Sequence, residues 1–225
     1  MAGIAAKKPA MKLVEQVLSA SGYGKVEPPN WGTVAIVGGG PSIIDFDFER
    51  LRGATVLAVK GSIFSIPWAD AGFGHDLARY NEWRDRLAAL PCRVYWAVHE
   101  DQLHRAHPAE NVTFLRRRDG GGFGSDEGAV YDGGTSGFGA FQIALHKRAK
   151  RIVLFGFDYD GSNEDVATDK RAAHNAANWK KWAEHFRAFV PHLRDSGVSV
   201  VNACPHSAIT CFQKVAVEDG VAALR

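Results

Sequence analysis

The sequence has little of what marks a secreted, membrane-bound or strongly basic protein. Only three of its 225 residues are cysteines, and they form no CxxC pair, which argues against a disulfide framework and favours a reduced, cytoplasmic protein. A run of about 18 apolar residues is missing, as is the apolar core of a signal peptide, so we expect no membrane span. Lys and Arg total 27 against 25 for Asp and Glu, so net charge gives no general attraction for nucleic acid.

Internal repeats are also missing, and the organisation is predicted to be simple. The length, with 46% apolar residues, suits one domain with a full core. We expect an N-terminal helix and linker in residues 1–30, with the helix at 11–20, and a single nucleotide-binding domain in residues 31–225. The oligomeric state stays open, a homo-oligomer included.

Short apolar runs rich in β-branched residues predict six strands with helical segments between them. Helices are expected at residues 135–148, at a segment that begins near residue 43, and along an apolar face that runs from Trp179 to Pro191. This alternation predicts an α/β class: one Rossmann-like domain with a mostly parallel twisted sheet, helices on both faces and ligands at the carboxyl ends of the strands. The strands are expected at residues 33–37, 55–59, 93–98, 112–115, 151–155 and 198–201.

Two glycine-rich turns follow predicted strands and precede predicted helices. In the first, made of Gly38, Gly39, Gly40, Pro41 and Ser42, glycines let backbone N–H groups approach an anion, and the serine hydroxyl can donate to a phosphate. A tight turn without a ligand is the simpler alternative.

The second turn, at residues 133–137, places Thr135, Ser136 and Gly137 at a positive helix end that suits a phosphate or ribose. Helix capping alone also explains its hydroxyls.

Acidic, histidine and cysteine residues near other strand ends suggest further site residues. Asp158 is placed to bind a ribose or an acceptor hydroxyl; its spacing to Asp160 resembles a metal-binding pair, but acids also end strands, and we predict no metal site. Cys204 is expected to be buried packing. The loop-edge histidines are candidate general bases, although each alone fits a surface residue: His75, His174 and His206. The basic runs at 116–118 and 147–151 can attract phosphates, but solvated charge is the default expectation for such runs.

Three segments in order resemble a known family: GGGPSI, TSGFGAFQIALHKRAKRIVLFGFDYD and VVNACPHSAITCF. They resemble the small single-domain bacterial sialyltransferases of glycosyltransferase family 42, which use a CMP-linked sugar. The order of these three segments also resembles that in a wider Rossmann-like group, which includes phage-encoded proteins, motility accessory factors and archaeal-type pterin diphosphokinases. The resemblance spans roughly residues 33–215.

The resemblance implies roles for residues in each segment. Gly40, Pro41 and Ser42 would line the nucleotide phosphate and ribose, and Thr135, Ser136 and Gly137 would hold the nucleotide and a donor carboxylate. Asp158 and Tyr159 would border the active site, with a tyrosine hydroxyl helping the leaving phosphate. His174 would be the catalytic base, with His185 as the fallback. Ser207 of the last segment would face the same crevice.

Two departures from the family pattern concern the donor. Gly39 and Lys60 stand where the family usually has Asn, and a lysine can neutralise a diphosphate. The donor is therefore left open between CMP- and UDP-linked sugars, with no tightly bound cofactor. His75 and Asp76 are expected to add a polar wall to the same pocket.

The leading hypothesis is a nucleotide-sugar-dependent glycosyltransferase, phage-encoded, that transfers a sugar to an acceptor hydroxyl. The acceptor is a glycan or a hydroxymethylated base in DNA. One alternative is a diphosphokinase-like enzyme that uses ATP and Mg²⁺ bound by Asp158 and Asp160. Another is a non-catalytic accessory protein that keeps the pocket as a scaffold.

Overall fold

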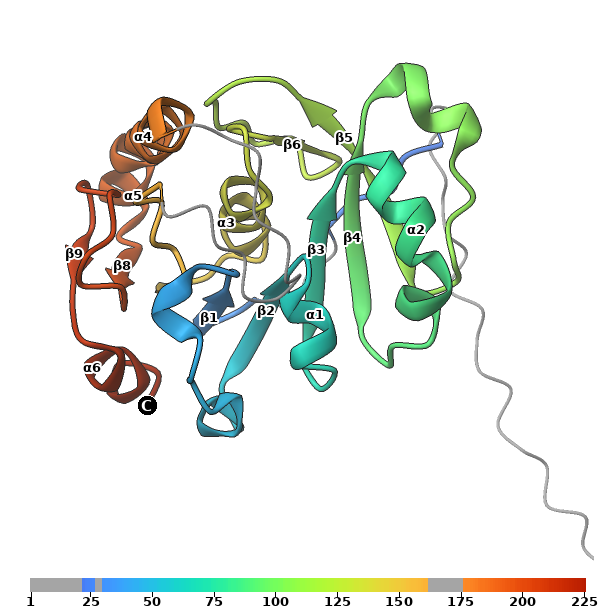
Figure 1. Cartoon of the computed structure of the whole chain (residues 1–225). Coiled ribbons are helices and arrows are strands. Elements are labelled where there is room, and N and C mark those ends of the chain that lie inside the picture. Colours follow the sequence, from blue (N-terminus) through green and yellow to red (C-terminus); the bar gives the residue numbers. More distant parts are fainter. Residues whose placement is uncertain (1–21, 27–29, 162–175) are drawn as a thin grey trace, which may run out of the picture.

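The structure is a computed structural model, and it describes residues 22–26, 30–161 and 176–225. Within these residues, nine parallel strands form one sheet in the order β6-β5-β4-β3-β2-β1-β7-β8-β9 (Figure 1). The strands are β1 (Thr33–Val37), β2 (Thr55–Val59), β3 (Ala71–His75), β4 (Arg93–Val98), β5 (Val112–Arg118), β6 (Ala129–Tyr131), β7 (Arg151–Phe155), β8 (Ser199–Asn202) and β9 (Gln213–Lys214).

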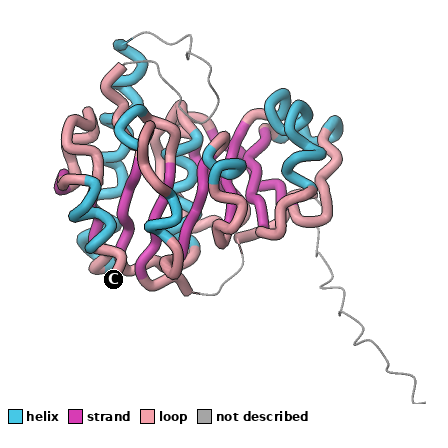
Figure 2. The backbone as a smooth tube through the Cα atoms, turned by 60° about the horizontal axis from the view of Figure 1, so that its bottom comes forward, coloured by secondary structure: helices cyan, strands magenta, loops and turns pink. Residues whose placement is uncertain are grey.

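Helices cover both faces of the sheet, as Figure 2 shows. One face packs against α3, α4, η4 and α5, and the other against α1, α2 and α6. This three-layer arrangement confirms the predicted α/β, Rossmann-like class. The helices are η1 (Pro41–Ile43), η2 (Phe48–Leu51), α1 (Ser62–Ser65), α2 (Leu77–Ala88), η3 (Glu100–Arg105), α3 (Ser136–His146), α4 (Ala176–His185), η4 (Phe186–Phe189), α5 (Val190–Ser196) and α6 (Val217–Ala222).

The central strands are apolar throughout because both of their faces are buried. In β1, Val34 and Ile36 join the core under α3, whereas Ala35 and Val37 join the core on the opposite face. On either side of β1, Ile36 pairs with Leu57 of β2 and with Leu154 of β7.

The chain reverses its direction across the sheet at β1. From β1 it proceeds outward through β2 to β6, then returns through α3 and places β7 on the other side of β1. The loops after β1 and β7 therefore diverge, and a crevice forms between the carboxyl ends of these two strands.

Most predicted elements are present, with some corrections at their ends. Four predicted strands have the observed bounds, the strand at 112–115 extends to Arg118, and the one at 198–201 lies one residue later. No continuous helix follows residue 43, where η1 and η2 are separate 3₁₀ turns. Pro191 lies in the first turn of α5, where its missing N–H is tolerated, instead of ending the helix. The predicted helix at 11–20 lies outside the described residues.

The sequence reading missed β3, whose segment AGFGH contains two glycines that weaken a strand pattern. Their small size has a packing reason. A Cβ on Gly74 would lie 2.3 Å from Cζ3 of Trp96 on β4, so the indole fills the space that a side chain would need.

We predict that Gly74→Ala lowers the free energy of unfolding by about 1–3 kcal/mol, because the extra methyl group overpacks a buried ring. Gly32→Ala is the matched control: no atom lies within 4 Å of its Cβ position, and the expected change is within about 0.5 kcal/mol. Urea unfolding of both variants measures the difference. Equal stabilities would mean that Trp96 does not lie against Gly74.

Candidate functional site

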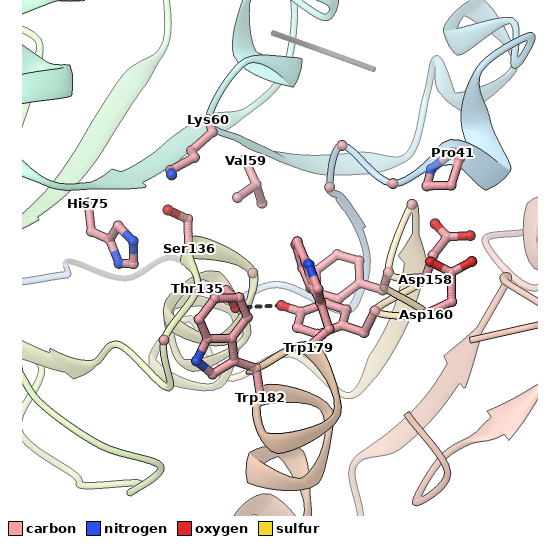
Figure 3. Close-up of a pocket in the computed structure, with 18 of the residues that line it drawn as sticks. Pro41, Val59, Lys60, His75, Thr135, Ser136, Asp158, Asp160, Trp179 and Trp182 are labelled. Atoms are coloured by element: carbon pink, nitrogen blue, oxygen red, sulfur yellow. Dashed lines mark hydrogen bonds between the residues drawn. The ribbon is translucent and has the colours of Figure 1, made fainter. Parts of the chain in front are cut away.

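A cavity of about 360 Å³ opens at the carboxyl edge of the sheet (Figure 3). This volume is within the range of small-molecule sites, about 300–1,000 Å³. The structure brings most of the predicted site residues together in its walls: Gly38, Gly39, Gly40, Pro41, Lys60, His75, Asp76, Thr135, Ser136, Gly137, Asp158 and Tyr159. Of the other lining residues, the sequence had pointed only to Gly134 in the second turn, to Arg117 in a basic run and to Asp160 in the metal alternative. The full set is Val59, Arg117, Gly134, Gly156, Phe157, Asp160, Gly161, Trp179 and Trp182.

The glycines of the first turn allow the loop after β1 to touch the loop after β7. Gly38 N donates to Phe155 O over 2.8 Å, and Gly40 N donates to Gly156 O over 3.0 Å. A Cβ on Gly40 would lie 2.0 Å from Oδ2 of Asp158, so a larger residue cannot fit. Two of the N–H groups expected to bind an anion are thus used within the protein in this arrangement.

Asp158 is held at the cavity wall by Ser42. The Ser42 hydroxyl donates to Oδ2 over 2.8 Å, and the Ser42 backbone N–H donates to Oδ1 over 3.2 Å. Burial raises the pKa of Asp158, the bonds from Ser42 lower it, and the charge of Asp160 raises it again. Ser42 does not itself line the cavity.

The last predicted loop supports the same wall from behind. Ser207 is buried and donates to Phe157 O over 2.6 Å, so it lies beneath the cavity wall and does not line the cavity. The Sγ of buried Cys204 accepts from Phe157 N over 3.1 Å. Burial raises the pKa of the Cys204 thiol to about 12, and the nearby Asp158 carboxylate adds to this, so the thiol stays protonated.

The start of α3 forms the opposite wall. Thr135 caps the helix, since its hydroxyl accepts from Phe138 N over 3.4 Å, and the same oxygen lies 2.5 Å from the hydroxyl of Tyr159. Burial raises the pKa of Tyr159, so its hydroxyl stays protonated. Ser136, only 3% exposed, has no hydrogen-bond partner for its Oγ within the described part of the chain.

Basic and histidine side chains line the cavity beside the start of α3. His75 is 6% exposed, and its Nδ1 has no hydrogen-bond partner among the residues described. Burial lowers the pKa of His75 well below its usual range, and the charges of Lys60 and Arg117 lower it further, so the imidazole is neutral at neutral pH. Figure 3 draws Lys60, His75 and Ser136 on the same side of the cavity.

Arg117 is held in the wall by Asp132, although the sequence reading treated it as solvated. Its Nε donates to Asp132 Oδ2 over 2.9 Å, and the other carboxylate oxygen accepts from Gly134 N over 3.0 Å. The pair therefore ties β5 to the turn before α3. An isolated basic run gives no sign of this partner.

Two tryptophans of α4 complete an aromatic wall. The ring centroids of Trp179 and Trp182 are 5.1 Å apart, and Trp179 lies 5.6 Å from Tyr159 in an edge-on arrangement. The sequence reading assigned both tryptophans to the core face of a helix. Both do pack against the core, and their half-buried rings also line the cavity, where they offer a surface on which a sugar or base can stack.

Backbone strain is concentrated at the cavity. Among the described residues, four that are not glycine have a positive φ, namely Lys60, Asp76, Arg148 and Tyr159, and all but Arg148 line the cavity. Such conformations cost of order 1–3 kcal/mol each and persist only where surrounding contacts impose them. At Asp76, with a φ of 87°, the backbone is held by bonds from Trp96 Nε1 to its oxygen and from its nitrogen to Ala97 O.

No protein-family model matches the sequence, and no curated protein matches it. Among solved structures, the chain is similar to the sialyltransferase CstII from Campylobacter jejuni in complex with a substrate analogue, cytidine-5'-monophosphate. The identity is 14%, the match covers 84% of this chain and 86% of that chain, and the TM-score is 0.50. A structure of CST-II with a trisaccharide acceptor and CMP matches at 16% identity over 80% of this chain and 84% of that one, with a TM-score of 0.48.

At this identity, the likeness shows the fold and no more. It agrees with the Rossmann-like class and leaves the chemistry to the residues of the cavity.

The remaining candidate bases are spread over different places. His174 lies outside the described residues. His185 does not line the cavity, and its Nδ1 lies 2.9 Å from Gly133 O in the turn before α3. His206 is exposed in the loop after β8 and does not line the cavity either.

The basic cluster at residues 147–151 leads into β7 at Arg151. It therefore lies at the amino end of the strand, away from the cavity at the carboxyl edge.

We predict that Asp76→Gly is more stable than Asp76→Ala by about 1–2 kcal/mol. Both variants lose the carboxylate that accepts from Ala78 N and caps α2, but only glycine relieves the positive φ. Urea unfolding measures the two free energies. Equal values would show that the backbone at residue 76 relaxes without strain.

Proposed function

We propose that the protein is a glycosyltransferase that takes a sugar from a nucleotide donor and transfers it to an acceptor hydroxyl. The observation that carries the proposal is the cavity at the β1 and β7 crevice. Its walls combine buried hydrogen-bonding atoms that have no partner among the described residues, carboxylates and an aromatic wall. Such a set suits an anionic leaving group, ribose or sugar hydroxyls, and a ring that stacks.

The reaction needs a bond between the acceptor oxygen and the anomeric carbon to form while the bond from that carbon to the phosphate oxygen breaks. The electron pair leaves on the phosphate, which the N-terminus of α3 stabilises. Tyr159 and Thr135 supply hydroxyl groups next to this end of the helix. The proton of the acceptor passes to a base, which we assign to His174, with Asp158 as the cavity carboxylate whose raised pKa also suits proton transfer.

The donor is a CMP- or UDP-linked sugar. The acceptor hydroxyl belongs to a glycan or, if the chain is phage-encoded, to a hydroxymethylated base in DNA.

We predict that a pyrimidine nucleotide raises the melting temperature of the protein without added metal. A ligand at about 100 times its Kd adds about 2.7 kcal/mol to the stability of the folded state. The measurement compares CMP, CDP, UDP, GDP and ATP, each with EDTA and with Mg²⁺. Stabilisation by ATP with Mg²⁺ alone would favour the diphosphokinase that uses Asp158 and Asp160, and no shift at all would favour a scaffold.

We predict that His174→Ala lowers the rate of sugar transfer by about 10²- to 10⁴-fold, because loss of a general base has this effect. The control is His206→Ala, an exposed histidine that does not line the cavity, for which the rate is expected to stay within about twofold. The donor is the sugar-linked form of the nucleotide that stabilises the protein, and chromatography measures the rate at which this nucleotide is released. If both variants keep the wild-type rate, the base is a cavity carboxylate and Asp158→Asn becomes the deciding variant.

A further inference from the structure

Two residues that line the cavity each have a buried hydrogen-bonding atom without a partner in the described part of the chain, one at the start of α3 and one at the end of β3. Ser136 is the first residue of this 11-residue helix, and its Oγ is unpartnered within the described ranges. The Nδ1 of His75, at the end of β3, is buried and unpartnered in the same sense. A buried polar atom without a partner costs about 1–3 kcal/mol, so two at one cavity indicate a ligand that supplies the missing bonds.

The charge in this corner suits an anion. The N-terminus of α3 carries a partial positive charge, and Lys60 brings an ammonium group to the same side of the cavity (Figure 3). The acidic residues of the cavity lie elsewhere: Asp158 and Asp160 are drawn on the opposite side, and the Asp76 carboxylate accepts from Ala78 N to cap α2. We call Lys60, His75 and Ser136 the anion corner.

The first glycine turn has fewer N–H groups available to bind a phosphate than its sequence suggests. The N–H groups of Gly38 and Gly40 already bind carbonyl groups of residues 155 and 156. The anion corner offers other groups to a charged leaving group: an ammonium, a hydroxyl and, in the tautomer with the proton on Nδ1, an imidazole N–H.

We infer that the anion corner binds the β-phosphate of a nucleoside diphosphate, so that the donor is a nucleoside diphosphate sugar and not a nucleoside monophosphate sugar. This inference rests on the proposed transferase function. In the nucleoside diphosphate that leaves, the β-phosphate is terminal, so it carries more charge and more acceptor oxygens than a carboxylate and matches a site with an ammonium, a hydroxyl and a helix N-terminus. The nucleoside then extends toward the opposite side of the cavity, where the Asp160 carboxylate accepts from a ribose hydroxyl.

The assignment defines the bond that breaks. The acceptor oxygen bonds to the anomeric carbon, the bond from that carbon to the β-phosphate oxygen breaks, and the nucleoside diphosphate leaves with the electron pair. The acceptor proton goes to the base, so atoms and charge balance without an oxidant or reductant. Lys60 and the start of α3 offset the charge that grows on the β-phosphate.

Calorimetric titration of the full chain with paired nucleotides tests the inference. CMP and CDP, UMP and UDP, GMP and GDP, and AMP and ADP are compared at one salt concentration, with and without Mg²⁺. For the base that binds, we expect the diphosphate to bind roughly tenfold or more tightly than the monophosphate. In Lys60→Met this ratio is expected to fall close to one, whereas Lys150→Met, an exposed control at the far end of the sheet, keeps it.

The outcomes separate the inference from the function on which it rests. If no nucleotide of any base binds, the proposed function fails. If a monophosphate binds as tightly as its diphosphate, or if Lys60→Met leaves the ratio unchanged, the nucleotide site stands and the inference is wrong. A CMP-linked sugar acid that binds through Lys60 more tightly than CDP would assign the corner to a carboxylate and would also overturn it.

A measurement on the unaltered protein guards against a variant that fails to fold. Nitrogen NMR of the histidine side chains is expected to show a shift of the His75 Nδ1 resonance with the diphosphate and a much smaller one with the monophosphate. Equal shifts with both nucleotides would contradict the inference.

Discussion

The loops after β1 and β7 touch through their backbones, and the cavity depends on this contact. Glycines at 38 and 40 let two N–H groups reach the carbonyl groups at the end of β7. The close approach also brings Ser42 within hydrogen-bond distance of Asp158. Because β1 and β7 are neighbours in one parallel sheet and the chain runs away from β1 in opposite directions, a crevice is expected at this edge.

The start of α3 is the second fixed point, and it is held from two sides. The Arg117 and Asp132 pair ties the turn before the helix to β5, and Tyr159 from the loop after β7 meets the capping Thr135. The body of the helix is buried against β1, β2, β3 and β6. A helix anchored along its whole length holds its N-terminal hydroxyls and N–H groups in place, so they need little reorganisation when charge develops.

Strain, orphaned atoms and a lowered pKa coincide at this cavity. Lys60, Asp76 and Tyr159 have uncommon backbone conformations there. His75 is buried and neutral, and its Nδ1 has no hydrogen-bond partner among the described residues. Each feature opposes stability and is imposed by the packed sheet around it. Such compromises are expected where a site is shaped for a ligand.

Much of the fold could be predicted from local sequence, because strand and helix periods follow directly from burial. The central strands and α3 are examples, and the turns at residues 38–42 and 133–137 identified the correct edge of the sheet. Strand β3 was missed because of its two glycines, Gly72 and Gly74. The side chains of Ile63 and Trp96, from other elements of the fold, occupy the space that a Cβ would need there. The small size of the two glycines is a tertiary requirement that no local pattern contains.

The sequence by itself determined the layered α/β class and the chemical types that gather at the strand ends. Only the tertiary structure decided which of them face the cavity: Ser42 and Ser207 bond to the protein, whereas Arg117 and Trp182 line the wall. The reason is physical. A side chain's partner is set by neighbours from other strands and helices, and the sequence lists those neighbours without saying which of them meet.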